Sequence, residues 1–107
     1  MKRLPGNKTV GKALVKISSK VKVKNSLGLH ARPATAIVKM LQQCNSSVTF
    51  TYRKETINAK SIMSILMLAA SKNATIRVDV EGEDAQEVMS MLVKAFEEYF
   101  GESHHGG

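Results

Sequence analysis

The chain has 107 residues, 43% of them hydrophobic and 23% charged, with a formal net charge of +7. This length suits one domain, and no run approaches the ~20 consecutive apolar residues that span a bilayer. The charged start is not followed by an apolar block, and the lone Cys44 cannot form an internal disulfide. We therefore expect a cytoplasmic protein without a membrane span or a secretory signal peptide.

The positive charge is concentrated at the N-terminus. Residues 1–24 contain eight Lys and Arg residues and no acidic residue, whereas the rest of the chain sets eight basic residues against all nine acidic ones. We interpret residues 1–15 as a flexible basic extension, residues 16–103 as one domain, and residues 104–107 as a flexible tail. A basic extension also suits a polyanion, so nucleic-acid binding is a remote alternative function.

The first part of the domain predicts a strand followed by a helix. From Ala13 to Lys24, apolar residues alternate with Lys or Ser, which is typical of a strand with one solvated face. A loop over Asn25–Leu29 follows, and Ala31–Gln43 carries apolar residues at helical spacing. Asn45 is a candidate left-handed stop for this helix.

The middle of the chain predicts a hairpin and a second helix. Residues 48–52 alternate apolar side chains with Thr, which indicates a half-buried strand. The polar pair Arg53-Lys54 breaks this pattern, and residues 57–59 follow as a short return strand. Residues 61–70 are rich in Ile, Leu and Met, and we expect them to form a helix.

The last part predicts a strand over residues 74–81 and a third helix. Asp84, with Glu87 three residues later, resembles a capping box at the helix start. The helix then carries one apolar stripe that extends to Phe100, and Gly101 ends it. The order β-α-β-β-α-β-α favours an α+β open-faced β-sandwich, with a four-stranded antiparallel sheet and three helices on one face.

The segment GLHARPAT, residues 28–35, places His30 at the start of the first predicted helix. The first amide N–H groups of a helix have no internal partner, and together with the helix dipole they form an anion site. We expect the amides of Ala31 and Arg32 to face a phosphate group, and the Arg32 guanidinium to grip its oxygens. Pro33 suits the first turn because its missing N–H costs no helical hydrogen bond. His30 is thus a candidate phosphoryl acceptor, although a cap or surface role fits the same position.

The second helix, within NAKSIMSILMLAA at residues 58–70, is apolar nearly all round. A helix on one face of a sheet buries only a stripe, so part of this surface should stay exposed. We expect Ile62, Met63 and Leu66 to dock a partner, because Met side chains adapt to several partners. Ser61 occupies the N-cap position and is also a candidate phosphorylation site, where added charge would oppose docking of an acidic partner.

Together, GLHARPA at 28–34 and NAKSIM at 58–63 resemble the motifs of HPr, the histidine-containing phosphocarrier family of the bacterial phosphotransferase system. The resemblance spans about residues 16–101 and implies a four-stranded antiparallel sheet with three helices. It implies that His30 receives a phosphoryl group on Nδ1 from enzyme I, which phosphoenolpyruvate charges, and passes it to enzyme IIA domains. Arg32 matches the arginine that assists this phosphoryl transfer in the family.

The same resemblance matches Ser61 to the serine that HPr kinase/phosphorylase modifies in some lineages, and places Ile62, Met63 and Leu66 on the docking surface. It implies a monomeric carrier that is itself phosphorylated, rather than a turnover enzyme, with no cofactor and no metal. The sequence departs from the family at Leu27, where small or polar residues are usual. A regulatory interaction module that acts mainly through Ser61 phosphorylation is the alternative function.

Overall fold

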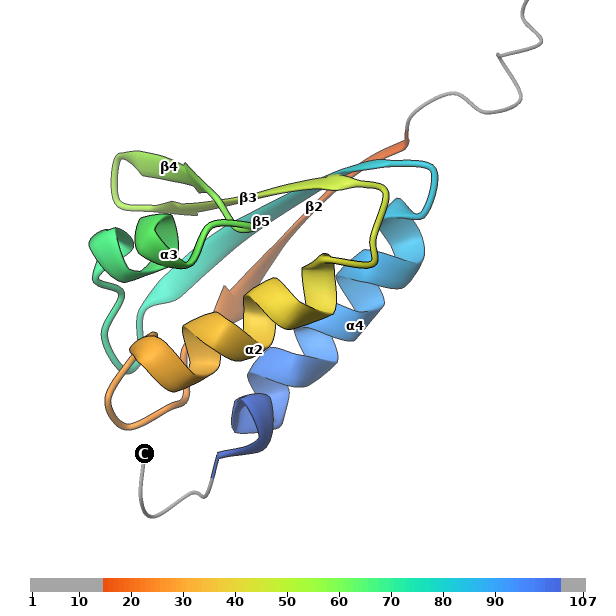
Figure 1. Cartoon of the computed structure of the whole chain (residues 1–107). Coiled ribbons are helices and arrows are strands. Elements are labelled where there is room, and N and C mark those ends of the chain that lie inside the picture. Colours follow the sequence, from red (N-terminus) through yellow and green to blue (C-terminus); the bar gives the residue numbers. More distant parts are fainter. Residues whose placement is uncertain (1–14, 103–107) are drawn as a thin grey trace, which may run out of the picture.

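The computed structural model describes residues 15–102, so the predicted basic extension, apart from Val15, and the predicted tail lie outside the described residues. Nucleic-acid binding through the extension therefore stays a prediction. The elements follow one another in the predicted order (Figure 1). They are the strands β2 (Val15–Lys22), β3 (Ser47–Tyr52), β4 (Glu55–Asn58) and β5 (Thr75–Gly82), the helices α2 (Ala31–Leu41), α3 (Ile62–Leu68) and α4 (Ala85–Glu97), and a 3₁₀ turn, η1 (Tyr99–Gly101).

The four strands form one antiparallel sheet in the order β2-β5-β3-β4. β5 lies inside the sheet, where Val80 is opposite Ile17 of β2 and Val48 of β3. Along β5, Ile76, Val78 and Val80 are buried, and the residues between them are more exposed. The alternating sequence pattern therefore corresponds to one buried and one solvated face, because successive strand residues point to opposite sides.

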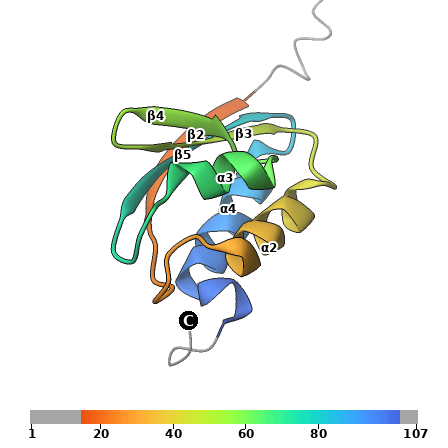
Figure 2. The same cartoon turned by 60° about the vertical axis from the view of Figure 1, so that its left-hand side comes forward.

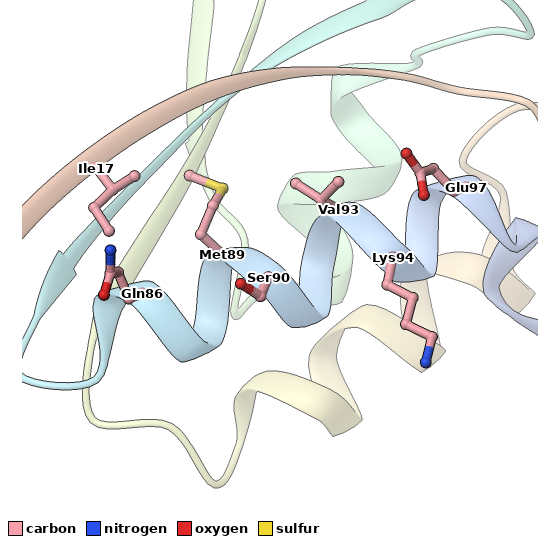
Figure 3. Close-up of a pocket in the computed structure, with 7 residues that line it drawn as sticks. All are labelled: Ile17, Gln86, Met89, Ser90, Val93, Lys94 and Glu97. Carbon is pink, nitrogen blue, oxygen red and sulfur yellow. The ribbon is translucent and has the colours of Figure 1, made fainter.

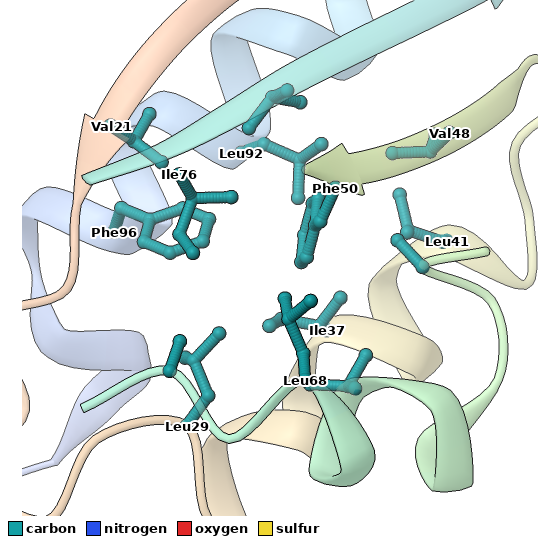
Figure 4. Close-up of a cluster of buried hydrophobic side chains, with 14 of the residues drawn as sticks. Val21, Leu29, Ile37, Leu41, Val48, Phe50, Leu68, Ile76, Leu92 and Phe96 are labelled. Atoms are coloured by element: carbon teal, nitrogen blue, oxygen red, sulfur yellow. The ribbon is translucent and has the colours of Figure 1, made fainter. Parts of the chain in front are cut away.

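Three α-helices cover one face of the sheet (Figures 1 and 2), which confirms the predicted α+β open-faced sandwich. α4 packs against β2 and β5, whereas α3 packs against β4 and α2. The core fills the space between helices and sheet, and Figure 4 shows Phe50, Phe96 and Ile37 pointing into it from three different elements. Each of these three side chains is at most 1% exposed. This common core fixes α2, whose first residues are the predicted site.

Two predicted helix signals are wrong, and one set of contacts explains both. α2 ends at Leu41 with Gln42 in a right-handed conformation, so Asn45 is not a left-handed stop. Instead, the Asn45 N–H donates to the Asp84 carboxylate at 2.9 Å, and the Ser46 hydroxyl donates to the same carboxylate. Asp84 precedes α4 but makes no side-chain cap, because its oxygens accept these bonds from the loop before β3.

The last helix is shorter than predicted. α4 ends at Glu97, and Phe100 adopts a φ of 50° within η1 instead of extending the helix. The Phe100 ring still packs on Phe96, with ring centroids 4.6 Å apart. Gly101, at a φ of 83°, continues the reversal of the chain. η1 thus lies against α2, and Glu102 becomes buried.

The predicted start of the first strand, Ala13, lies outside the described residues, and the remaining predicted bounds agree with the observed elements to within two residues. Among residues 15–102, no helix has both the length and the apolar character needed to cross a membrane.

Candidate functional site

His30 is the N-cap residue of α2, as predicted. Its backbone is extended, with φ −83° and ψ −165°, and its side chain makes no capping hydrogen bond. The first amide bond of the helix runs from the Ala34 N–H to the His30 carbonyl, at 3.0 Å. Pro33 has no N–H, so Ala31 and Arg32 carry the helix-terminal N–H groups for which α2 offers no acceptor. The imidazole therefore stands beside two amides that can bind an anion.

The loop before α2 fixes the position of His30 relative to the core. Leu29 is buried, and its N–H donates to the Ala70 carbonyl at 3.0 Å. Gly28 has a φ of +71°, and its N–H donates to the Asn25 carbonyl at 2.9 Å. A Cβ atom at position 28 would lie 2.4 Å from the Ala70 carbonyl oxygen. Only glycine meets both requirements, namely a left-handed backbone and contact with the segment after α3.

Glu102 completes the site, although sequence reasoning did not include it. Its Oε2 atom lies 3.1 Å from His30 Nε2 and 3.9 Å from Arg32 Nε. Its Oε1 atom accepts a hydrogen bond from the Asn25 amide, which also donates to the Tyr99 carbonyl at 2.9 Å. The Glu102 side chain is only 4% exposed. No spacing signal joins residues 25, 30 and 102, because the turn at η1 brings them together.

The two nitrogens of the His30 ring have different surroundings. Nε2 is buried against Glu102, and neither Nε2 nor Glu102 Oε2 has a hydrogen-bond partner, so their contact is electrostatic. The ring as a whole keeps 27% of its side-chain exposure. The Arg32 side chain is 77% exposed, and its Nε atom lies 3.9 Å from Glu102 Oε2. Most of its guanidinium donors are therefore available.

Ser61 is the N-cap of α3, and its hydroxyl oxygen accepts a hydrogen bond from the Ser64 N–H at 3.2 Å. This confirms the capping role read from the sequence. Ser61 itself is half-buried at the start of the helix.

The exposed side of α3 forms an apolar patch, made of Ile62, Met63, Leu66 and Met67. Their exposed fractions are 37%, 66%, 36% and 77%, respectively, whereas Ile65 and Leu68 on the same helix are buried. Met67 is the most exposed of the four, and the docking prediction did not include it. Because α3 packs against α2, this α3 patch lies on the element next to the one that carries His30.

A groove between β2 and α4 lies apart from the predicted site residues (Figure 3). It has a volume of about 450 Å³, and none of the predicted site residues lines it. Its walls are Ile17, Gln86, Met89, Ser90, Val93, Lys94 and Glu97.

Residues 17–98 match a protein-family model described as the PTS HPr component phosphorylation site. Phosphocarrier protein HPr of Chlamydia muridarum is 46% identical over 80 residues, which cover 75% of this chain and 77% of that protein. Phosphocarrier protein HPr of Neisseria meningitidis is 36% identical over 86 residues, which cover 80% of this chain and 97% of that protein.

A solved structure shows the same arrangement. The crystal structure of HPr-C-His from Thermoanaerobacter tengcongensis superposes with a TM-score of 0.78 at 34% identity, covering 81% of this chain and 98% of that chain. Sequence motifs, fold and relatives agree with one another. The chain therefore belongs to the HPr family of phosphocarrier proteins of the phosphotransferase system.

Proposed function

We propose that His30 is the phosphoryl acceptor of this phosphocarrier, that enzyme I is its donor, and that enzyme IIA domains are its acceptors. The observation that carries the proposal is the position of the imidazole as N-cap of α2, next to the open amides of Ala31 and Arg32. Nδ1 is the reacting nitrogen, because Nε2 is buried against Glu102. The donor and acceptors come from what the HPr resemblance implies.

The reaction is a reversible displacement at phosphorus. The Nδ1 lone pair of His30 forms a bond to phosphorus, while the bond between phosphorus and the donor enzyme breaks and its electron pair stays with the donor. The phosphoryl oxygens then accept hydrogen bonds from the Ala31 and Arg32 amides and from the Arg32 guanidinium. The helix terminus contributes about 1 kcal/mol to holding the new charge, so the phosphoryl group is held weakly enough to be passed on.

The α3 patch is the docking surface in this proposal. Two of its side chains, Met63 and Met67, are among the most exposed large apolar residues of residues 15–102. Flexible Met side chains can repack against more than one partner, as a carrier needs when it meets a donor and several acceptors in turn.

The first test is phosphorylation by enzyme I and phosphoenolpyruvate, followed by acid treatment. The wild-type protein should gain an acid-labile phosphoryl group, and His30→Ala should gain none, because no other residue offers this nitrogen at the helix terminus. The chain has three histidines, so His104→Ala and His105→Ala are matched controls that should label like wild type. Labelling of His30→Ala at the wild-type level would refute the proposal.

A second proposed function is regulation through Ser61, for which HPr kinase/phosphorylase is the candidate modifying enzyme. Ser61 directly precedes Ile62 and Met63 of the α3 patch, and its hydroxyl lies at the helix start. A phosphoserine carries a charge of about −1.5 to −2, which would stand beside apolar side chains that a partner has to cover. This modification would therefore weaken docking.

The test uses purified HPr kinase/phosphorylase and ATP. We expect wild type to be labelled and Ser61→Ala not, while Ser61→Asp should accept the phosphoryl group on His30 more slowly because its charge opposes docking. Ser71→Ala, at another exposed serine, is the control and should behave like wild type. Label that persists in Ser61→Ala would assign the modification elsewhere.

A further inference from the structure

The Glu102 side chain is only 4% exposed and lies against the ring of the proposed acceptor, where the proposed phosphoryl transfer uses it only to cover Nε2. It is held from two sides. The Asn25 amide donates to Oε1, and Oε2 lies 3.1 Å from His30 Nε2. Asn25 is itself 1% exposed and also binds the Tyr99 carbonyl, so the carboxylate is anchored to the fold rather than free on the surface.

We infer that Glu102, held by Asn25, is a positioning residue that keeps the ring proton of His30 on Nε2 and so leaves the lone pair on Nδ1. This inference rests on the proposed phosphoryl transfer and adds a residue to it. A neutral imidazole has one N–H and one lone-pair nitrogen, and the environment decides which is which. An ionised carboxylate only accepts hydrogen bonds, so the tautomer with the proton on the nearer nitrogen, Nε2, is favoured.

The contact also stabilises the positive charge that the reaction creates on the His30 ring. When Nδ1 binds phosphorus while Nε2 keeps its proton, the ring becomes cationic, and the Glu102 carboxylate stands 3.1 Å from the protonated nitrogen. The positive charge of the ring and the negative charge of the carboxylate then balance, and no proton has to enter or leave the site. When the phosphoryl group departs, the electron pair of the broken N–P bond returns to Nδ1 and the ring is neutral again. The carboxylate of a Ser-His-Asp triad orients an imidazole and stabilises its cation by the same physics.

Burial makes this contact stronger than an ordinary surface pair. Nε2 and Oε2 lie 3.1 Å apart, and both are buried with no hydrogen-bond partner. An exposed ion pair contributes little, whereas a pair withdrawn from water is screened less. Arg32, 3.9 Å from the same oxygen, keeps its guanidinium near the site while its remaining donors stay exposed for the phosphoryl group.

The first measurement is the tautomer of His30, read from two-bond ¹H–¹⁵N couplings of the ring at a pH well above the range in which histidine titrates. We expect the wild-type ring to carry its proton on Nε2. Glu102→Ala should show a mixture of the two tautomers. Glu97→Gln, which removes an equal charge from an exposed position on α4, should keep the wild-type pattern. An unchanged tautomer in Glu102→Ala overturns the inference.

The second measurement is the initial rate of phosphorylation by enzyme I and phosphoenolpyruvate. Glu102→Ala and Glu102→Gln should be slower than wild type by about tenfold, because both remove the negative charge that lies 3.1 Å from Nε2 when the ring becomes cationic. Glu97→Gln should keep the wild-type rate. An unchanged rate overturns the inference, and so does a faster one, because it would mean that the carboxylate repels the incoming phosphate.

Two further measurements distinguish a failure of this inference from a loss of fold or a failure of the proposed function. Thermal unfolding of each variant shows whether a loss of rate is only a loss of fold, and Asn25→Ala should shift the tautomer in the same direction as Glu102→Ala. If wild type itself accepts no phosphoryl group from enzyme I, the proposed function fails, and the tautomer measurement, which needs no donor, still decides the role of Glu102. If wild type is phosphorylated and the Glu102 variants match it in rate or in tautomer, only this inference fails.

Discussion

Gly28 and His30 show how one backbone conformation controls the position of the proposed phosphoryl acceptor. The left-handed φ of Gly28 lets the chain approach the Ala70 carbonyl, after which buried Leu29 anchors the loop and His30 emerges at the start of α2. His30 and Arg32 could be predicted because they belong to one local motif at a helix start. Glu102 could not, because its contact spans more than 70 residues of sequence and carries no periodic signal.

Gly28→Ala should destabilise the protein and displace His30. The new methyl group would meet the Ala70 carbonyl oxygen at 2.4 Å in a backbone conformation that side chains disfavour. We expect the free energy of unfolding in urea to fall by about 1–3 kcal/mol, the usual cost of one strained residue. Gly101→Ala is the matched control, since Gly101 also has a positive φ, but a Cβ there meets no atom within 4 Å. Equal losses in the two variants would show that the clash with Ala70 has no effect.

At the scale of the elements, the side chain that begins a helix can bind a distant loop instead, and the sequence pattern then predicts the wrong contact. The motif of Asp84 and Glu87 is a sound helix-start signal, yet the Asp84 carboxylate binds the loop before β3 instead of its own helix. The two uses compete for the same oxygens, and sequence proximity cannot say which one wins. Ser61, whose cap is purely local, was predicted correctly.

The Asp84 contacts predict an acid-sensitive contribution to stability. The Ser46 hydroxyl and then the Asn45 N–H lower the pKa of the Asp84 carboxyl below its usual value. A carboxyl group whose folded-state pKa is lowered stabilises the fold above its unfolded pKa of about 3.9, and this contribution is lost as the pH falls through the folded-state pKa. The free energy of unfolding should therefore decline from about pH 5 downward.

Ser46→Ala should weaken this decline, because it removes the hydrogen bond that contributes most to lowering the pKa of Asp84. Urea unfolding of wild type and variant at several pH values measures it. Ser47→Ala, whose hydroxyl reaches only the Glu81 carbonyl at 3.4 Å, is the control and should follow the wild-type curve. An identical pH dependence in Ser46→Ala and wild type would contradict the assignment.

On the scale of the whole molecule, a row of aromatic rings links the sheet to the site. Phe50 of β3 meets Phe96 of α4 edge-on at 5.8 Å, and Phe96 meets Phe100 of η1 at 4.6 Å. Phe100 precedes Gly101 and Glu102, so the packing of this ring on the core helps to bring the carboxylate to His30. Core packing and the site are thus parts of one connected structure.

Phe96→Ala should reduce the free energy of unfolding by about 3–5 kcal/mol, because it leaves a cavity in the centre of this row. Phe100→Ala, which truncates a half-buried ring, should cost less but should still release Glu102 from His30. Urea unfolding measures the first effect, and the His30 tautomer measures the second. A larger loss of stability in Phe100→Ala than in Phe96→Ala would contradict this ordering.

The sequence by itself determined the order of elements, the buried face of each, and the positions of His30, Arg32 and Ser61. These features depend on periodicity and on local hydrogen bonding, which act between residues close in the chain. The tertiary structure alone decided where Asp84 binds, where α4 ends and which carboxylate meets His30. Each of these is a competition between a local contact and a distant one, and the outcome depends on the position of groups that only the packed core brings together.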